Sequence, residues 1–262
     1  MFRSLYTAAS GMTAQQTNLD NVANNLANAN TAGFRKRRVQ FQDMIYQNMV
    51  TPGAAATQQT VSAGMQIGLG TRASATEILQ SQGDFQQTGN SLDLAIQGLG
   101  YFQVLMPNGQ TAYTRSGSFH LDAQGNVVTA DGNALQPAVT IPADATSITV
   151  GSDGTVTVTQ TGQTQSQQIG QIQLATFPNP GGLNSIGTNL LLPTSSSGDP
   201  IVGNPGGSEG LGTLVQGSLE QSNVNTVEEF IQMILAQRSY EANSQVAKAA
   251  DQMFQEVNQM GK

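Results

Sequence analysis

Residues 18–38 read NLDNVANNLANANTAGFRKRR, and this stretch decides the fold. Its apolar residues recur every three or four positions, as they do along one face of an α-helix. Six of the first thirteen residues are nevertheless asparagine, a residue that weakens helices. A helical rhythm that carries so many asparagines predicts a helix with a second, polar contact face.

The same rhythm runs back toward the N-terminus and predicts a helix over about residues 4–30. Gly33 is the expected C′ residue that ends it. Alternating steps of three and four are the heptad pattern of a coiled coil. The predicted seam consists of Leu5, Ala8, Met12, Gln15, Leu19, Val22, Leu26 and Ala29.

Four asparagines, Asn18, Asn21, Asn25 and Asn28, form a stripe beside this apolar seam. Each costs up to about 0.7 kcal/mol of helix propensity relative to alanine. The stripe is either a solvated or frayed face, or a set of amides that bond to neighbouring helices as donor and acceptor. We favour the second alternative. Since one chain offers only two long helices, further copies of the chain are expected to supply the partners.

The C-terminal region, about residues 224–260, also predicts a helix. Thr226 and Glu229 have the spacing of a capping box ahead of an apolar run. The seam that follows fits an eleven-residue repeat better than a heptad. It consists of Ile231, Leu235, Arg238, Ala242, Val246, Ala249, Met253, Val257 and Met260.

All nine prolines lie between Pro52 and Pro205, so both ends are free of the main helix breaker. The region from about residue 92 to 201 has short alternating runs, such as SITV (147–150) and TVTVT (155–159). Asn108-Gly109, Asp131-Gly132 and Asp153-Gly154 separate such runs and are typical hairpin signals. An Ala/Gln/Thr-rich stretch at 51–64 is expected to form an extended excursion or a hairpin.

These patterns predict an α+β protein in three parts. Residues 1–34 and 220–262 form long terminal helices that pair as a coiled coil. Residues 35–91 and 203–219 form the segment that connects these helices to the central domain, with an insertion at about 46–68. Residues 92–202 form a central, mainly antiparallel β domain.

Composition excludes several functions. The chain has no cysteine, so it has no disulfides and no Cys-ligated metal. A net charge of −7 argues against nucleic acid as a partner. No apolar run approaches the roughly 20 residues of a membrane span, and the first residues lack the apolar segment of a cleaved signal peptide. We expect no membrane insertion, and either a cytosolic protein or export without a cleaved leader.

Catalytic and metal-binding patterns are absent or incomplete. Ser118, His120 and Asp122 alternate on a predicted strand, about 6.6 Å apart, too far for nucleophile and base. Residues 122–126 resemble a calcium loop but lack most of its acidic ligands. We therefore predict no enzyme, no catalytic residue, no cofactor and no metal site.

The basic run Arg35, Lys36, Arg37 and Arg38 follows the first helix. It either touches phosphate or pairs with acids of a neighbouring subunit, and the second alternative is favoured. Candidate acids are Glu220, Glu228 and Glu229. The predicted subunit interface comprises Leu5, Met12, Asn18, Leu19, Asn21, Val22, Asn25, Leu26, Asn28, Arg35, Lys36, Arg37, Arg38, Ile231, Leu235, Ala242, Val246, Met253 and Val257.

Three stretches resemble the axial proteins of the bacterial flagellum, the rod and hook family. ANNLANANTAGFRK (23–36) is similar to the rod-protein signature, and SNVNTVEEFIQMILAQRSYEANSQ (222–245) to its C-terminal counterpart. LAIQGLGYFQV and the following residues, to 137, resemble the family's β domain. GMQIGLGTR (64–72) is similar to the stretch that sets the distal rod apart from the hook.

The resemblance implies a structural subunit of the basal body that self-assembles into the helical tube of the distal rod. This drive shaft crosses the periplasm and transmits torque to the hook. The implied partners are further copies, proximal rod proteins, the hook protein, the P-ring and L-ring proteins and the flagellar type III export apparatus.

Two alternatives stay open from the sequence. The chain is another axial protein, of the proximal rod or a short hook, or it belongs to a different class. That class is a monomeric, secreted β-rich binding protein or polysaccharide-active enzyme with helical tails.

Overall fold

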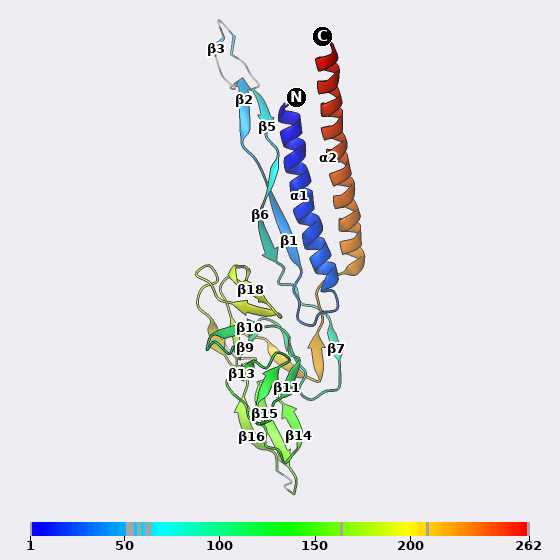
Figure 1. Cartoon of the computed structure of the whole chain (residues 1–262). Coiled ribbons are helices and arrows are strands. Elements are labelled where there is room, and N and C mark those ends of the chain that lie inside the picture. Colours follow the sequence, from blue (N-terminus) through cyan, green and yellow to red (C-terminus); the bar gives the residue numbers. More distant parts are fainter. Residues whose placement is uncertain are drawn as a thin grey trace. The chain divides into compact units, whose positions relative to one another are not determined.

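The computed structural model describes residues 2–50, 55–56, 59–60, 64–162, 165–207 and 210–260. The chain folds into two compact units (Figure 1). The first, which we call the helical unit, comprises residues 1–27, 37–77 and 225–262. The second, the β unit, comprises residues 28–36 and 78–224. Long terminal helices and a central antiparallel β region confirm the predicted α+β class.

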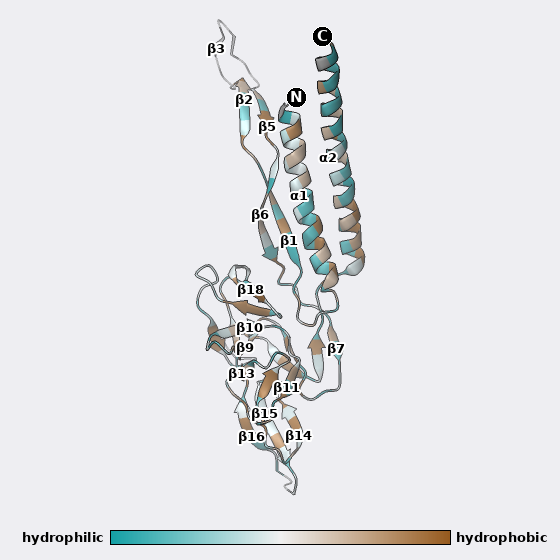
Figure 2. Cartoon of the chain, in the orientation of Figure 1, coloured by the Kyte–Doolittle hydropathy of each residue, from teal (hydrophilic) through white to brown (hydrophobic). Residues whose placement is uncertain are grey.

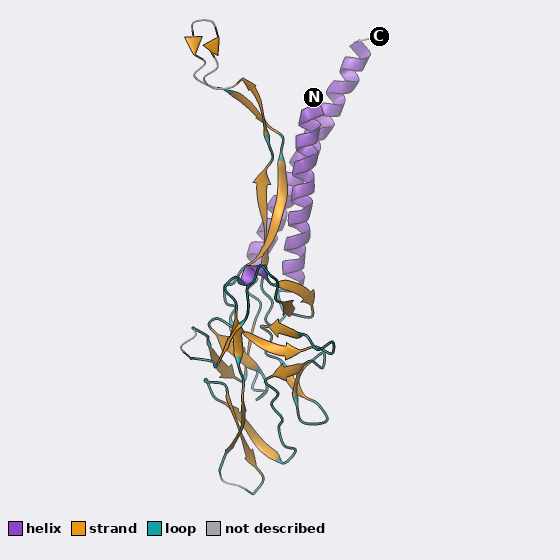
Figure 3. Ribbon diagram, turned by 90° about the vertical axis from the view of Figure 1, so that its left-hand side faces the viewer, coloured by secondary structure: helices purple, strands orange, loops and turns teal. Residues whose placement is uncertain are grey.

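In the helical unit, α1 (Phe2–Ala27) and α2 (Thr226–Met260) pack along each other (Figure 1). Strand β1 (Arg37–Asp43) packs on α1 and pairs with β6 (Thr71–Ile78). These two strands lie where the sequence predicted only a connection, because RRVQFQD and TRASATEI have too few apolar residues to alternate clearly. The ribbon is drawn in orange beside the purple helices in Figure 3.

The predicted insertion begins as a hairpin. Strand β2 (Tyr46–Val50) pairs antiparallel with β5 (Met65–Gly68). Two further short strands, β3 (Ala55–Ala56) and β4 (Gln59–Thr60), pair between them. The rest of the predicted excursion, residues 51–54, 57–58 and 61–63, lies outside the described residues.

The two predicted helix boundaries are corrected by one turn or less. Helix α1 ends at Ala27, so Gly33 is not its C′ residue. Gly33 has φ +72° and donates its N–H to the carbonyl of Glu220; an added Cβ would lie 2.5 Å from the backbone N of Ser116. Its glycine is therefore needed for a close backbone approach within the β unit.

The N-cap of α2 lies one residue before the predicted cap, Thr226. Asn225 Oδ1 accepts hydrogen bonds from the N–H groups of Val227 and Glu228, at 3.0 and 3.3 Å. Asn225 is thus the N-cap, and Thr226 is the first helical residue. Glu228 and Glu229 lie in the first turn, where carboxylates suit the positive end of the helix dipole.

The β unit is built around a nine-stranded antiparallel sheet. Its path runs β11-β12-β13-β9-β10-β19-β18, and β17 joins β9 to β20. The strands are β9 (Tyr101–Leu105), β10 (Thr111–Thr114), β11 (Phe119–Leu121), β12 (Val127–Thr129), β13 (Ala134–Gln136), β17 (Leu174–Thr176), β18 (Asn184–Gly187), β19 (Leu190–Leu192) and β20 (Ile201–Gly203), with the 3-10 helix η1 (Pro180–Gly182) before β18.

Smaller sheets complete this unit. Strands β14 (Ala145–Val150), β15 (Thr155–Gln160) and β16 (Gln167–Gln171) form a three-stranded sheet. Two ribbons, β8 (Leu94–Gln97) with β21 (Thr213–Gln216) and β7 (Phe85–Gln87) with β22 (Ser218–Glu220), join the beginning of the unit to its end. The predicted strand runs 147–150 and 155–159 are confirmed as parts of β14 and β15.

All three predicted hairpin signals connect paired strands. Gly109, Gly132 and Gly154 have φ between +81° and +83°, and each donates its N–H to the carbonyl three residues earlier. The asparagine or aspartate therefore precedes the left-handed residue, as in a type I turn closed by glycine. The dipeptides predicted the turns correctly because only glycine adopts this conformation without strain.

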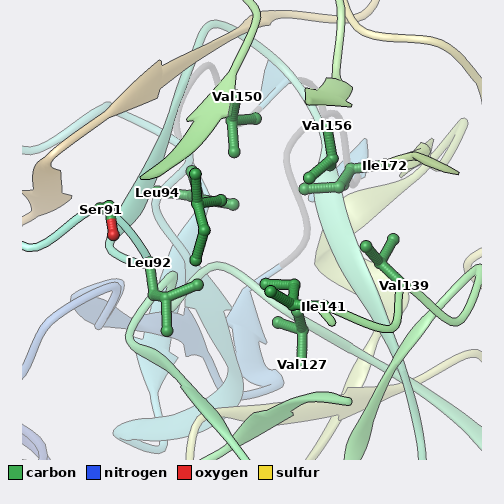
Figure 4. A pocket seen from close by; sticks show the side chains of 10 residues that line it. Ser91, Leu92, Leu94, Val127, Val139, Ile141, Val150, Val156 and Ile172 are labelled. Atoms are coloured by element: carbon green, nitrogen blue, oxygen red, sulfur yellow. The ribbon is translucent and has the colours of Figure 1, made fainter. Parts of the chain in front are cut away.

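The core of the β unit lies on both faces of the main sheet. On one face Phe102 and Phe119 pack edge to face, with ring centroids 5.1 Å apart. On the other, Tyr113 and Phe177 do the same at 4.8 Å. A cavity of about 10 Å³ lies around Leu94, lined by nine apolar side chains and Ser91 (Figure 4). Its apolar lining gives a water no partners, so it is a packing gap and not a ligand site.

Candidate assembly surface and the polar clusters that support it

The side of α2 that packs on α1 carries mostly small residues. Its buried or half-buried positions are Glu229, Met233, Ala236, Asn243, Ser244, Ala247, Ala250 and Phe254. Four of these eight residues are alanine or serine. None of the seven predicted seam residues that lie on α1 is exposed, and Ala8 and Val22 are buried. The helices therefore pair closely but bury little apolar area for their length.

The large apolar residues of α2 point the other way. Ile231 and Leu235 are 53% and 55% exposed, and Val246 and Met253 are about half exposed. We call this set the α2 apolar face: Val227, Phe230, Ile231, Ile234, Leu235, Val246, Met253 and Met260. Apolar residues recur along this helix in Figure 2. The predicted C-terminal seam thus lies on the uncovered side; Ala242 is also exposed, and the side chain of Val257 lies outside the described residues.

The asparagine stripe makes contacts inside the chain. Asn21 and Asn25 each donate to the carbonyl of Arg37, at 2.8 and 2.9 Å. Asn25 is 1% exposed, accepts the N–H of Arg37 at 3.0 Å and donates to Glu229 at 3.1 Å. One carboxamide therefore ties α1 to β1 and to the first turn of α2. Asn28 accepts from Thr31, and Asn18 is half-buried.

The basic run also finds acids within the chain. Arg35 pairs with Glu220 at 2.9 Å, and Arg38 pairs with Glu77 at 2.9 Å. Glu220 was a predicted partner, although the sequence favoured a neighbouring subunit as its source. The backbone N–H of Lys36 donates to Asn223 at 2.7 Å. Subunit contacts by Lys36, Arg37 and the rest of the predicted interface stay predictions.

Glu220 lies at the centre of a buried ionic cluster in the β unit. Its carboxylate contacts Arg115 Nε at 2.5 Å and Arg35 Nη2 at 2.9 Å, and accepts the N–H of Gly83 at 3.1 Å. Arg115 also donates to the carbonyls of Ile96, Gly98 and Gly100. The side chains of Glu220 and Arg115 are 2% and 3% exposed. Residues 35, 115 and 220 are thereby held together although they are far apart in sequence.

Sequence reasoning missed Arg115. Its only signal was that it is the one cation between Phe85 and Pro205. A lone arginine in a nearly uncharged module is a candidate buried ion partner, because burial requires compensation. Within the cluster, burial lowers the pKa of Arg35, Glu220 opposes this shift, and Arg115 adds to it.

Tyr101 lies beside this cluster and gives the β unit a dependence on alkaline pH. Its hydroxyl donates to Gln80 at 2.9 Å, and burial raises its pKa above the usual 10. A raised folded pKa contributes stability below the unfolded pKa, and that stability is lost as pH rises through the folded value. We expect the free energy of unfolding to fall above about pH 10, and less so in Y101F, as measured by urea titrations across that range.

Other chemistry is not assembled. Among the described residues, no group of three or more His, Cys, Asp or Glu side chains could hold a metal. Asp122, from the rejected hydrolytic trio, accepts bonds from Gln124 and Asn126 in a turn; the bonds from Asn126 lower its pKa. None of the helices in the described ranges is both long and apolar enough to cross a membrane.

Paired terminal helices, an inserted β unit and an uncovered apolar helix face define a structural subunit. Three family models match: "Flagella basal body rod protein" at residues 5–35, "Flagellar hook protein FlgE/F/G D1 domain" at 95–158, and "Flagellar basal body rod FlgEFG protein C-terminal" at 215–260. They cover both terminal helices and the start of the β unit.

Relatives match along nearly the whole chain and are named flagellar basal-body rod protein FlgG. The protein from Caulobacter vibrioides is 47% identical, over 98% of this chain and 99% of its own length. Those from Borreliella burgdorferi and Bacillus subtilis are 45% and 42% identical, over at least 98% of both chains. The chain belongs to the FlgG family of flagellar basal-body rod proteins. Members of this family are structural components of the basal body, not enzymes.

Proposed function

We propose that this chain is the subunit of the distal rod. Copies assemble into a helical tube, with the terminal helices lining the inside and the β unit forming the outer layer. The tube crosses the periplasm and transmits torque to the hook. The observation that carries the proposal is the α2 apolar face, which one chain leaves uncovered.

The distribution of side chains supports association of copies. Helix α2 turns alanines toward α1 and leaves isoleucine, leucine, valine and methionine exposed. Burying an exposed leucine or isoleucine contributes about 1.5–3 kcal/mol. A contiguous exposed apolar surface marks an interaction site. Copies of the same chain fit it because they bring the same elongated apolar face.

The remaining partners follow from a rod position. Proximal rod proteins would contact one end of the tube and the hook protein the other, with the P-ring and L-ring around it. Export through the flagellar type III apparatus, without a cleaved signal peptide, would deliver the subunits. We also propose the functional division into residues 1–34 with 220–262, 35–91 with 203–219, and 92–202. Neither nucleic acid nor membrane insertion has a part in this function.

Replacing both Ile231 and Leu235 by serine tests the proposal. We expect the variant to remain soluble at concentrations where the wild-type chain polymerises, because the largest exposed apolar contacts are removed. Pelleting by ultracentrifugation and negative-stain electron microscopy measure the effect. Gln232→Ser with Gln237→Ser, two exposed positions of the same helix, is the matched control and should polymerise.

Two outcomes would contradict the proposal. The first is polymerisation of the serine variant at the wild-type concentration. The second is electron microscopy of purified basal bodies that locates the chain in the proximal rod or hook instead.

A further inference from the structure

Gly11 is the only glycine in the described helical residues, 2–27 and 226–260. It lies within α1, where glycine costs about 1 kcal/mol relative to alanine. An isolated glycine inside a helix is therefore expected to have a packing reason, such as a neighbouring group that leaves no room for a side chain.

The neighbouring group lies on helix α2 and is the side chain of Asn243. A Cβ added to Gly11 would lie 2.8 Å from Asn243 Nδ2 and 3.2 Å from its Cγ. Carbon contacts are optimal at about 3.5–4.0 Å. The carboxamide of Asn243 thus occupies the place where a side chain of residue 11 would begin. Asn243 is the one carboxamide among the eight buried or half-buried residues of α2.

We propose that Gly11 and Asn243 fix the axial alignment of α1 against α2. A slide of one turn along α1 would bring Thr7 or Gln15 to the carboxamide, and a slide of one heptad would bring Ser4 or Asn18. Each of these residues carries a Cβ. Only the present alignment therefore seats Asn243 without moving its side chain, whereas an apolar heptad seam by itself tolerates a shift.

The alignment matters for assembly, and this consequence rests on the proposed function. One helical turn is about 5.4 Å. Such a shift would move the α2 apolar face by that length relative to α1 in one copy but not in the next. Copies with mixed alignments could not repeat the same contact around a tube.

Distance measurements between the helices test the proposal. The chain has no cysteine, so Ala9→Cys and Gln245→Cys, both exposed, can carry the only two spin labels. We expect one distance population in the full-length chain. Asn243→Ala should add a second population, displaced by roughly one turn, about 5 Å. Gly11→Ala should do so too, although it raises helix propensity. Gln237→Ala, on the exposed side, is the control and should keep one population.

A second population in either variant supports the proposal. The wild-type distance alone in both variants would overturn it. Loss of any defined distance in both, with reduced helical circular dichroism, would also overturn it, because the pair would then act on stability and not on alignment. Pelleting of the unlabelled wild-type chain is scored separately: a chain that never polymerises contradicts the proposed function and leaves the alignment result standing.

Discussion

Glu220→Gln is expected to destabilise the β unit by about 3–5 kcal/mol, the cost of removing one partner from a buried ion pair. The substitution keeps the shape of the side chain but leaves Arg115, which is 3% exposed, without a counter-charge. Arg35 loses its carboxylate as well, and its buried Nε has no hydrogen-bond partner even in the intact cluster. Urea unfolding followed by tyrosine circular dichroism measures the loss.

Glu77→Gln is the matched control. Glu77 pairs with Arg38 at 2.9 Å, the same separation as Arg35 and Glu220, but the side chains of Arg38 and Glu77 are 62% and 41% exposed. An exposed pair contributes about 0–1 kcal/mol. If the two variants lost equal stability, burial would not be what gives the Glu220 cluster its importance.

Asn25→Leu is expected to lower the free energy of unfolding of the helical unit by on the order of 3 kcal/mol. The variant leaves the N–H of Arg37 without its acceptor, and an orphaned buried donor costs about 1–3 kcal/mol. It also removes the bond to Glu229, while the carbonyl of Arg37 keeps Asn21. Hydrogen exchange at the Arg37 amide should accelerate by about two orders of magnitude, since 1.4 kcal/mol is a factor of ten.

Asn24→Ala is the comparison for this variant. Asn24 precedes Asn25 in the chain and is exposed. Surface substitutions stay within about 0.5 kcal/mol, so exchange at Arg37 should hardly change. Equal acceleration in both variants would mean that the buried carboxamide of Asn25 is not what holds this junction.

Local patterns predicted the local structure well. The apolar rhythms located both terminal helices, and the Asn-Gly and Asp-Gly dipeptides located three hairpins, because spacing and left-handed glycines are properties of short segments. The cap at Asn225 was missed by one residue, because Thr226 with Glu229 and Asn225 with Glu228 have the same spacing.

Long-range partnerships could not be predicted. Arg115 and Glu220 are 105 residues apart, and nothing local marks them as a pair. The apolar pattern of α2 identified a stripe, and its assignment to a subunit interface stays a prediction. Periodicity shows that residues share a helix face, and only the fold shows which face α1 covers. The asparagine stripe was likewise predicted as a contact surface. Its hydrogen bonds to Arg37 could not be predicted, because the sequence did not indicate strand β1, where Arg37 lies.

The ribbon of β7 and β22 has a consequence for the order of events during folding. Helix α1 finds its partner about 200 residues further along the chain, and closing so long a loop costs entropy. Once the β unit has formed, Gly33 is bonded to Glu220 and Lys36 to Asn223. The segments that lead to α1 and α2 then start from adjacent points of the β unit. The two helices are therefore short tethered segments that meet at high effective concentration. A chain that stops short of residue 226 lacks the helix on which α1 packs, so the helix pair forms only after the last residues of the chain have been made.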